Sequence, residues 1–277
     1  MKKFLTLILA LTMAVGLCAC GGTAEEPAAD DAAEAVTLKV AATATPHAEI
    51  LAQVVDVLAE QGITLEVTEY SDYVVPNTAV EEGDMDANYF QHTPYMEQFN
   101  EENGTHLVSV AKVHYEPMGV YAGKTATLEE LADGAVIAVP NDVTNEARAL
   151  LLLESLGLIE IDDAAGLSAT PNDITSNPKN LTFKELEAAM LPQTVEEVDL
   201  SVINANYALQ GGLNPAQDAL AIEDSASDAA QTYANILSVK EGNEQNPAIL
   251  ALIDALNSDA VREFIDATYS GSVVAMF

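Results

Sequence analysis

The chain has 277 residues and is strongly acidic, with 44 Asp and Glu against 10 Lys and Arg and a formal net charge of -34. This balance excludes non-specific nucleic-acid binding, because such binding requires Lys and Arg to neutralise phosphates. The only cysteines, Cys18 and Cys20, lie within the first 20 residues. The remaining chain therefore has no disulfide, thiolate metal site or Cys nucleophile, and its stability must come from its apolar core.

The first 20 residues have the pattern of an export signal. Lys2 and Lys3 precede an apolar run at 4–17 that is too short to span a bilayer stably. The run ends in Leu17-Cys18-Ala19-Cys20, which resembles the bacterial lipoprotein signal, in which the final Cys becomes the lipidated N-terminus. An ordinary secretory signal is the alternative. We expect Cys20 to carry the lipid and residues 21–35, which are acidic and lack large apolar groups, to form a disordered tether.

Beyond the tether, strands alternate with helices that have clear start and stop residues. Thr45-Pro46 is typical of a helix start and Gly62 of a helix end. For the first part of the chain the pattern predicts strands at 38–42, 63–67, 87–90, 106–113 and 118–122, and helices at 45–62, 77–83 and 93–104. After residue 124 it predicts strands at 135–139, 181–183, 199–204, 219–222 and 233–239, and helices at 127–131, 141–157, 184–190, 247–256 and 259–268.

This alternation indicates an α/β fold with mainly parallel sheets. Extended segments near residues 120 and 237 predict two lobes joined by two crossovers. We expect lobe I to contain 36–122 plus 237–277 and lobe II to contain 123–236, with the C-terminal helices packing back on lobe I.

Motifs for catalysis are missing from the sequence. It has no glycine-rich phosphate loop, no nucleophile elbow and no H-E-x-x-H, and its four histidines do not fall at metal-ligand spacing. We therefore expect no enzyme activity, no metal and no cofactor.

Arg148 is the first candidate for a binding residue. It lies in the first turn of the Leu-rich helix, where a cation opposes the positive end of the helix dipole. An anion held jointly by the guanidinium and the free helix N–H groups would compensate this charge. An ion pair with a nearby carboxylate such as Glu146 is the alternative.

Aromatic residues and strand-end asparagines supply further candidates. Six aromatic side chains fall between residues 70 and 99 and could line an apolar pocket with polar tips, or could form a local hydrophobic core: Tyr70, Tyr73, Tyr89, Phe90, Tyr95 and Phe99, with His92 among them. Asparagine disfavours strands, yet Asn204, Asn206 and Asn235 lie at strand ends. Their amides could hold a zwitterion or could serve as turn and cap residues.

These candidates together suit a free amino acid. Arg148 and Asn145 could hold its carboxylate, and Asn204 and Asn235 could accept from its ammonium. Tyr73, Phe90 and His92 could surround its side chain, where aromatic walls favour a thioether by ~0.3–1.5 kcal/mol per contact, too little to exclude leucine.

Several longer stretches carry a resemblance to a known family: Thr45-Pro-His-Ala-Glu-Ile-Leu, Asp84-Met-Asp-Ala-Asn-Tyr-Phe-Gln-His-Thr-Pro-Tyr, Glu116-Pro-Met-Gly-Val-Tyr, Pro140-Asn-Asp-Val-Thr-Asn-Glu-Ala-Arg-Ala-Leu-Leu-Leu-Leu, Asn177-Pro-Lys, Val202-Ile-Asn-Ala-Asn-Tyr-Ala and Tyr233-Ala-Asn-Ile. Over residues 38–277 the chain resembles the NlpA lipoprotein family, the methionine-binding lipoproteins of bacterial ABC importers. It departs from the family pattern at Val143, at Glu146-Ala147, at Gln193 and in the longer segment 225–232.

The resemblance implies a two-lobed periplasmic-binding-protein fold, type II-like, with the ligand in the interlobe cleft. It implies Arg148 on the methionine carboxylate, Asn145, Asn204 and Asn235 around the backbone groups, and Tyr73, Phe90, His92 and Tyr115 around the side chain.

The function implied is a lipid-anchored binding protein on the extracytoplasmic face of the cell membrane. It would be a monomer that captures L-methionine and delivers it to the permease and ATPase of an ABC importer. The alternatives are a binding protein for another small amino acid or a methionyl dipeptide, an exported enzyme on the same fold, and an adhesin-type lipoprotein.

Overall fold

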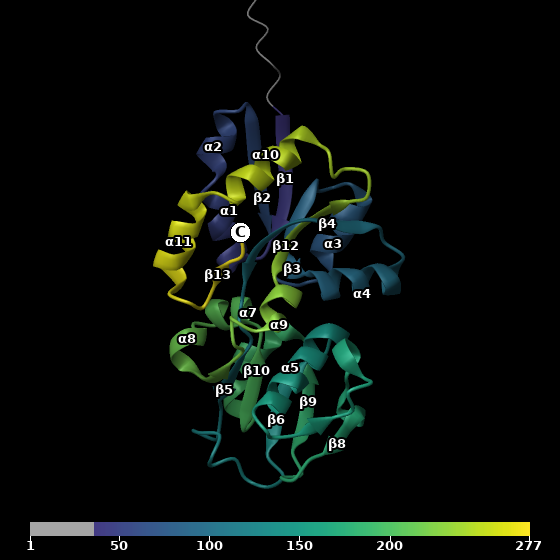
Figure 1. The fold of residues 1–277 in the computed structure, drawn as a ribbon, viewed down its shortest axis with the longest axis vertical. Helices are drawn as coiled ribbons and strands as arrows, with labels where there is room; N and C mark the ends of the chain where they lie inside the picture. Colours follow the sequence, from purple (N-terminus) through teal and green to yellow (C-terminus); the bar gives the residue numbers. More distant parts are fainter. Residues whose placement is uncertain (1–35) are drawn as a thin grey trace, which may run out of the picture. The chain divides into compact units, whose positions relative to one another are not determined.

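In the computed structural model, two main β-sheets organise residues 36–277, the part of the chain that the structure describes apart from the side chains at 228 and 229 (Figure 1). The expected signal peptide, the lipidated Cys20 and the tether lie outside the described residues. No helix of the described part is long and apolar enough to cross a membrane.

The first sheet has six strands, in the order β13 (Val274–Ala275), β4 (Leu107–Tyr115), β12 (Asn235–Lys240), β3 (Ala87–His92), β1 (Val36–Ala42) and β2 (Ile63–Glu69). The pairs of β1 are parallel, whereas those of β12 are antiparallel. Neighbouring residues of a strand point to opposite faces of the sheet. Because apolar residues lie on both faces, helices pack on both. Leu237 and Val239 lie in one apolar core and Ile236 lies in another.

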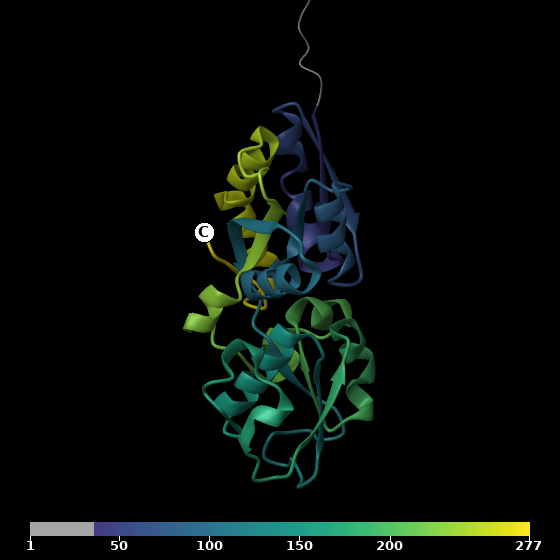
Figure 2. The ribbon, with the colours of Figure 1, turned by 90° about the vertical axis from the view of Figure 1, so that its right-hand side faces the viewer.

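The helices of this first lobe divide between those two cores. One core takes residues from α1 (Glu49–Ala52), α2 (Val55–Ala59), α10 (Pro247–Leu256) and α11 (Asp259–Tyr269). The smaller core takes residues from α3 (Val75–Glu82) and α4 (Thr93–Asn103). Figures 1 and 2 show the purple-to-blue and the yellow segments together in this lobe, so the two C-terminal helices pack beside the N-terminal ones.

The second sheet has five strands, in the order β11 (Ala219–Ile222), β5 (Gly119–Ala122), β10 (Leu200–Ile203), β6 (Val136–Pro140) and β9 (Thr182–Leu186). Helix α5 (Val143–Ser155) packs on one face, and α6 (Leu191–Thr194) and α7 (Ala205–Gln210) pack on the other. The lobe is completed by shorter elements: β7 (Glu160–Ile161) paired with β8 (Ile174–Ser176), α8 (Pro215–Asp218), α9 (Asp228–Thr232), and single turns at Gly166–Ser168, Pro171–Asp173, Ala188–Met190 and Val195–Glu197.

The chain passes between the sheets at residues 116–118 and again at 233–234. The first crossover comes earlier than the sequence suggested, because β5 pairs with β10 and β11 in the second sheet, whereas residues 119–122 were assigned to lobe I. We therefore propose lobe limits of 36–116 plus 235–277 and of 117–234.

Three predicted helices differ from the observed elements. Residues 127–131 form turns, and the helix predicted at 184–190 is replaced by β9, which pairs in parallel with β6 over 182–186, and a single turn. The helical propensity of this segment is overridden by pairing with a buried strand, a tertiary effect that a local pattern does not contain. The helix predicted at 45–62 is divided into the irregular turn η1 (Ala44–Ala48), α1 and α2.

Adjacent residues of α10 test the packing on the first sheet. Ile249 is fully buried and Leu250 is 40% exposed. We expect Ile249→Ala to lower the free energy of unfolding by ~2–5 kcal/mol, because it leaves a cavity. Leu250→Ala should lower it by less than about 1 kcal/mol. Urea titrations of both variants measure the difference, and equal losses would contradict the assigned face of α10.

Two carboxyl groups predict opposite dependences of stability on pH. Burial raises the pKa of Glu146 to about 7, with contributions from the carboxylates of Glu185 and Asp142. The backbone N–H of His106 donates to Glu81 and lowers the pKa of Glu81 to about 2. A raised pKa means that the fold opposes ionisation, so stability is lost as pH rises from 4.5 through 7. A lowered pKa means that stability is lost as pH falls from 4.5 through 2.

We therefore expect Glu146→Gln to match the wild type in melting temperature at pH 4 and to exceed it at pH 8. Glu81→Gln should melt below the wild type at pH 7, and the difference should shrink as the pH falls toward 2. Thermal melts of the three proteins across this range provide the measurement. A Glu146→Gln protein that is less stable at pH 8 would refute the assigned burial.

Candidate functional site

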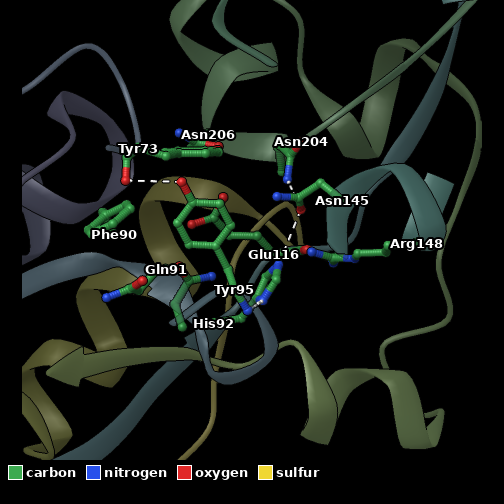
Figure 3. A pocket seen from close by; sticks show the side chains of 12 residues that line it. Tyr73, Phe90, Gln91, His92, Tyr95, Glu116, Asn145, Arg148, Asn204 and Asn206 are labelled. Carbon is green, nitrogen blue, oxygen red and sulfur yellow. Dashed lines mark hydrogen bonds between the residues drawn. The ribbon is translucent and has the colours of Figure 1, made fainter. Parts of the chain in front are cut away.

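One pocket gathers side chains from both lobes (Figure 3). Its empty volume, which includes space open to solvent, is about 340 Å³. The residues that line it are Tyr73, Phe90, Gln91, His92, Tyr95, Glu116, Asn145, Arg148, Asn204, Ala205, Asn206 and Asn235. Seven of the eight residues proposed from the sequence are among them, and Tyr115 is not.

The lining residues lie where strands and helices begin or end. His92 is the last residue of β3 and the N-cap of α4, and Asn204 follows β10 as the N-cap of α7. Asn145 and Arg148 belong to the first turns of α5, directly after β6. In open α/β sheets, the ends of strands and the following helix starts are the usual place for a ligand.

The helix N-terminus at α5 differs from the prediction. The side chain of Asp142, not an external anion, caps it and accepts from the backbone N–H of Asn145 at 3.0 Å. Burial raises the pKa of Asp142 above its usual value and outweighs the hydrogen bonds from Asn145, which act in the opposite direction. We expected an anion to be held jointly by the guanidinium and by free helix N–H groups. The part of this expectation that concerns the N–H groups is wrong, because the side chain of Asp142 occupies the helix end.

Arg148 is buried and forms an ion pair, but its partner is Glu223 and not Glu146. Its Nε donates to Oε1 of Glu223 at 2.8 Å, and its Nη2 donates to Oε2 at 2.6 Å and to the carbonyl of Glu116 at 2.8 Å. The ring of Tyr233 lies 4.3 Å from the guanidinium carbon, close enough for a cation–π contact. Burial opposes ionisation of Glu223, but Arg148 outweighs it and lowers the pKa of that carboxyl. Among the described residues these bonds leave Nη1 uncommitted.

Tyr115 belongs to this ion pair rather than to the pocket wall. Its hydroxyl donates to Oε2 of Glu223 at 2.6 Å, and the backbone N–H of Met118 donates to the same oxygen at 2.8 Å. The side chain of Tyr115 is fully buried. We therefore remove it from the group that surrounds a ligand side chain.

Asn145 connects residues of the two lobes. Its Oδ1 accepts from Nδ2 of Asn204 at 2.8 Å and from Nε2 of His92 at 3.2 Å, while its Nδ2 donates to Asp142. The other imidazole nitrogen of His92 accepts from the backbone N–H of Tyr95 at 3.2 Å. Burial, together with the charge of Arg148, lowers the pKa of His92 to about 3. His92 is therefore a neutral donor with a fixed tautomer at neutral pH.

The aromatic residues divide between the pocket wall and the cores. Tyr73 lies 5.6 Å from Phe90 and 4.8 Å from Tyr207 between ring centroids, and its hydroxyl donates to Oδ1 of Asn206 at 2.6 Å. Tyr89 and Phe99 pack in the two cores of the first lobe instead. For those two the hydrophobic-core alternative is right.

Two amide atoms of the lining are buried without a hydrogen-bond partner among the described residues. They are Oδ1 of Asn204, an acceptor, and Nδ2 of Asn206, a donor. Buried polar groups are nearly always hydrogen-bonded in native proteins. Because one atom is an acceptor, the other is a donor and both lie in one pocket, a ligand that has both donors and acceptors would satisfy them.

Sequence reasoning missed Glu116, Gln91 and Ala205 as lining residues, and it named Asn206 and Tyr95 as candidates without assigning them to a part of the ligand. Glu116 and Asn206 stand in stretches that carried the family resemblance, so that signal was available. The histidine spacing gave no hint that the fold brings His47 and His114 beside Glu116, with one ligand-type atom from each within 4.8 Å of the others.

Comparison with known proteins places this pocket in a family. The model of the NlpA lipoprotein family matches residues 38–277. The methionine-binding lipoprotein MetQ of Bacillus subtilis is 41% identical over 280 residues, covering 99% of this chain and 98% of that protein. A lipoprotein structure from Ruminococcus gnavus has a TM-score of 0.86 at 55% identity, covering 87% of this chain and 99% of that one. A nutrient binding protein from Burkholderia cenocepacia bound to methionine has a TM-score of 0.82 at 42% identity, covering 87% and 100%. The chain belongs to the NlpA lipoprotein family and has the two-lobed fold of its substrate-binding relatives.

Proposed function

We propose that this protein is a lipid-anchored extracytoplasmic binding protein that captures L-methionine and delivers it to an ABC importer. The observation that carries the proposal is the pocket itself, in which uncommitted donors and an acceptor of the second lobe face an aromatic wall from the first lobe. The names of the relatives, which include methionine-binding lipoproteins and a methionine-bound structure, support the choice of ligand. The proposal assigns binding and release to the protein and no chemical turnover.

The ligand carboxylate is assigned to Arg148. Its Nη1 carries two N–H donors, and Nη1 is not used by the bonds to Glu223 and to the carbonyl of Glu116. Asn206 supplies a further unpartnered donor in the same lining. Asn145 acts as a positioning residue, because both ends of its amide are committed to Asp142, His92 and Asn204.

The ligand side chain is assigned to the wall formed by Tyr73, Phe90 and His92. Tyr73 and Phe90 are tilted at 34° with their centroids 5.6 Å apart. A thioether gains ~0.3–1.5 kcal/mol from each contact with an aromatic ring, so methionine is favoured over leucine by a modest margin. Another small amino acid or a methionyl dipeptide is the closest competing ligand. An adhesin would not require converging partners for a zwitterion, and this disfavours that reading.

Capture requires the two lobes to approach each other around the ligand. The crossovers at 116–118 and 233–234 are the segments that connect them, and hinge closure of this kind excludes water from the ligand. We propose that the protein acts as a monomer and that the closed form is recognised by the permease of the importer, which its ATPase drives.

The carboxylate assignment predicts a large loss on removing Arg148. We expect Arg148→Ala to weaken L-methionine binding by at least ~30-fold, because truncating one partner of a buried charge pair costs ~2–5 kcal/mol. Isothermal titration calorimetry on protein unfolded and refolded to strip carried ligand measures the affinity. Arg262→Ala is the matched control, since the other arginine of the chain lies on α11 over the ring of Phe277.

The control should bind L-methionine within about twofold of the wild type. A loss below tenfold in Arg148→Ala, with the variant folded by circular dichroism, would remove Arg148 from the site. Wild-type protein that gives no heat with L-methionine, or that binds L-leucine equally well, would refute the ligand.

The membrane anchor is assigned to Cys20, and Cys18 offers a matched control. We expect Cys20→Ala to move the protein from the membrane pellet to the soluble fraction in cells that process lipoproteins, because a covalent lipid supplies the membrane affinity. Cys18→Ala should stay in the pellet. Metabolic labelling with a fatty acid reports the lipid directly, and label retained in Cys20→Ala would show that the anchor lies elsewhere.

A further inference from the structure

Glu116 is the one acidic side chain among the residues that line the pocket. It is 5% exposed and lies at the first crossover between the lobes. A buried carboxylate is costly unless it is paired and hydrogen-bonded, so its surroundings decide what it can do. Neither sequence reasoning nor the comparisons give it a role.

Two neutral imidazoles hold this carboxyl group. Nε2 of His114 lies 2.6 Å from Oε1 of Glu116, and Nε2 of His47 lies 3.3 Å from the same oxygen. Burial lowers the pKa of His114 to about 3 and the pKa of His47 to about 4. Neither imidazole therefore brings a positive charge that would cancel the charge of the carboxylate at neutral pH.

The hydrogen bonds fix where the imidazole protons lie. Nε2 of His47 is also 3.0 Å from Oδ1 of Asn235, which is only an acceptor, so this nitrogen carries the proton. Its Nδ1 then accepts from the hydroxyl of Thr43 at 2.7 Å. His114 has the same arrangement, with its Nδ1 on the hydroxyl of Tyr89 and its Nε2 on Glu116. His114 thus donates its N–H to the carboxylate, and the N–H of His47, which Asn235 accepts, lies beside the same oxygen.

The carboxylate keeps capacity for one more donor. An ionised carboxyl group has about four lone-pair sites. The N–H of His114 takes one of them, and the N–H of His47, which donates to Asn235, lies 3.3 Å from the same oxygen. Burial raises the pKa of Glu116, and the charge of Arg148 and a hydrogen bond from the backbone N–H of Asn206 act against this effect. Because Glu116 lines the pocket, a free lone pair of its carboxylate is available to a donor of the ligand.

The charges of the pocket leave a negative balance. Arg148 and Glu223 form a close pair that is neutral as a whole, and Glu116 adds a carboxylate without a charged partner. The carbonyl of Glu116 accepts from Nη2 of Arg148 at 2.8 Å, so the two residues are direct neighbours. The ammonium and the carboxylate of an amino acid are attached to the same carbon. The two protein groups that bind them must therefore also lie close to each other, as Glu116 and Arg148 do.

We propose that Glu116 is the anionic partner of the ligand's α-ammonium and makes a free ammonium group a requirement for binding, an inference that rests on the proposed function. His47 and His114 are its positioning residues, since they hold the carboxylate without neutralising it. Asn235, whose Oδ1 was expected to meet the ammonium, also accepts from His47 and orients it. Asn204, with its unpartnered Oδ1, remains a second acceptor for the ammonium.

The same three residues could hold a divalent metal ion, because one ligand-type atom from each lies within 4.8 Å of the others. A metal would require the lone pair of Nε2 on both imidazoles. The bond from His47 to Asn235 places a proton there, which favours the hydrogen-bonded arrangement. The experiment below separates the two.

The test compares L-methionine with its desamino analogue, 4-(methylthio)butanoate, by calorimetry on wild type, Glu116→Gln and Glu146→Gln. In the wild type we expect the analogue to bind at least ~100-fold more weakly, because it leaves Glu116 without its partner and its own carboxylate is no longer balanced by an ammonium. In Glu116→Gln this ratio should fall below about tenfold. Glu146→Gln, a buried carboxyl on α5 outside the pocket lining, should keep the wild-type ratio.

The outcomes distinguish the proposals. Wild-type protein that does not bind L-methionine refutes the proposed function itself. Wild-type protein that binds methionine and its desamino analogue with similar affinity overturns the role of Glu116 while the function stands, and this measurement needs no variant. An unchanged ratio in folded Glu116→Gln overturns it as well. EDTA-treated protein can also be titrated with ZnCl₂. A zinc site that is lost in Glu116→Gln, with an unchanged ratio of the two affinities, would overturn the role of Glu116 in favour of the metal site.

Discussion

The buried ion pair of Arg148 with Glu223 is the interaction on which the site depends. Removing two charges from water is unfavourable unless the geometry is close and the remaining donors and acceptors are satisfied. Here the guanidinium makes two bonds to the carboxylate, and Tyr115 and the backbone of Met118 satisfy Glu223 further. The pair therefore fixes the direction of the guanidinium before any ligand arrives, and a preorganised donor loses less entropy on binding.

The same pair touches both crossovers between the lobes. The carbonyl of Glu116 and the N–H of Met118 belong to the first crossover, and the ring of Tyr233 against the guanidinium belongs to the second. Any rotation of one lobe against the other at these segments acts on the surroundings of Arg148. Ligand binding and lobe movement thus share contacts, which is the physical condition for a ligand to favour one arrangement of the lobes over another.

The sequence predicted the parts of this site that depend on neighbouring residues, and it failed where partners are distant. A strand followed by a capped helix placed Asn145 and Arg148 correctly at a strand end, and the same reasoning placed Asn204. The carboxylate that pairs with Arg148 lies 75 positions away, whereas the alternative considered from the sequence was a nearby carboxylate such as Glu146, two positions away. His47 and Asn235 are separated by 188 positions, so their contact could come only from the fold. The predicted helix at 184–190 failed for the same reason, since a strand partner from β6 outweighed the local helical preference.

The overall charge of the chain has little to do with how its pocket discriminates. Exposed carboxylates act through water of high dielectric constant and are screened within ~10 Å at moderate salt, so most of the 44 acidic residues do not reach the ligand. Among the residues that line the pocket only Arg148 and Glu116 carry an acidic or basic group apart from a neutral imidazole, and Glu223 lies behind Arg148 as its partner. The remaining polar contacts come from neutral amides, hydroxyls and imidazoles. A neutral His92 and neutral amides can satisfy a ligand's hydrogen bonds, but they cannot reject a ligand of the wrong charge. Because the charged groups are buried, each is felt more strongly than a surface charge, and their order along the pocket fixes which end of a zwitterion each one accepts.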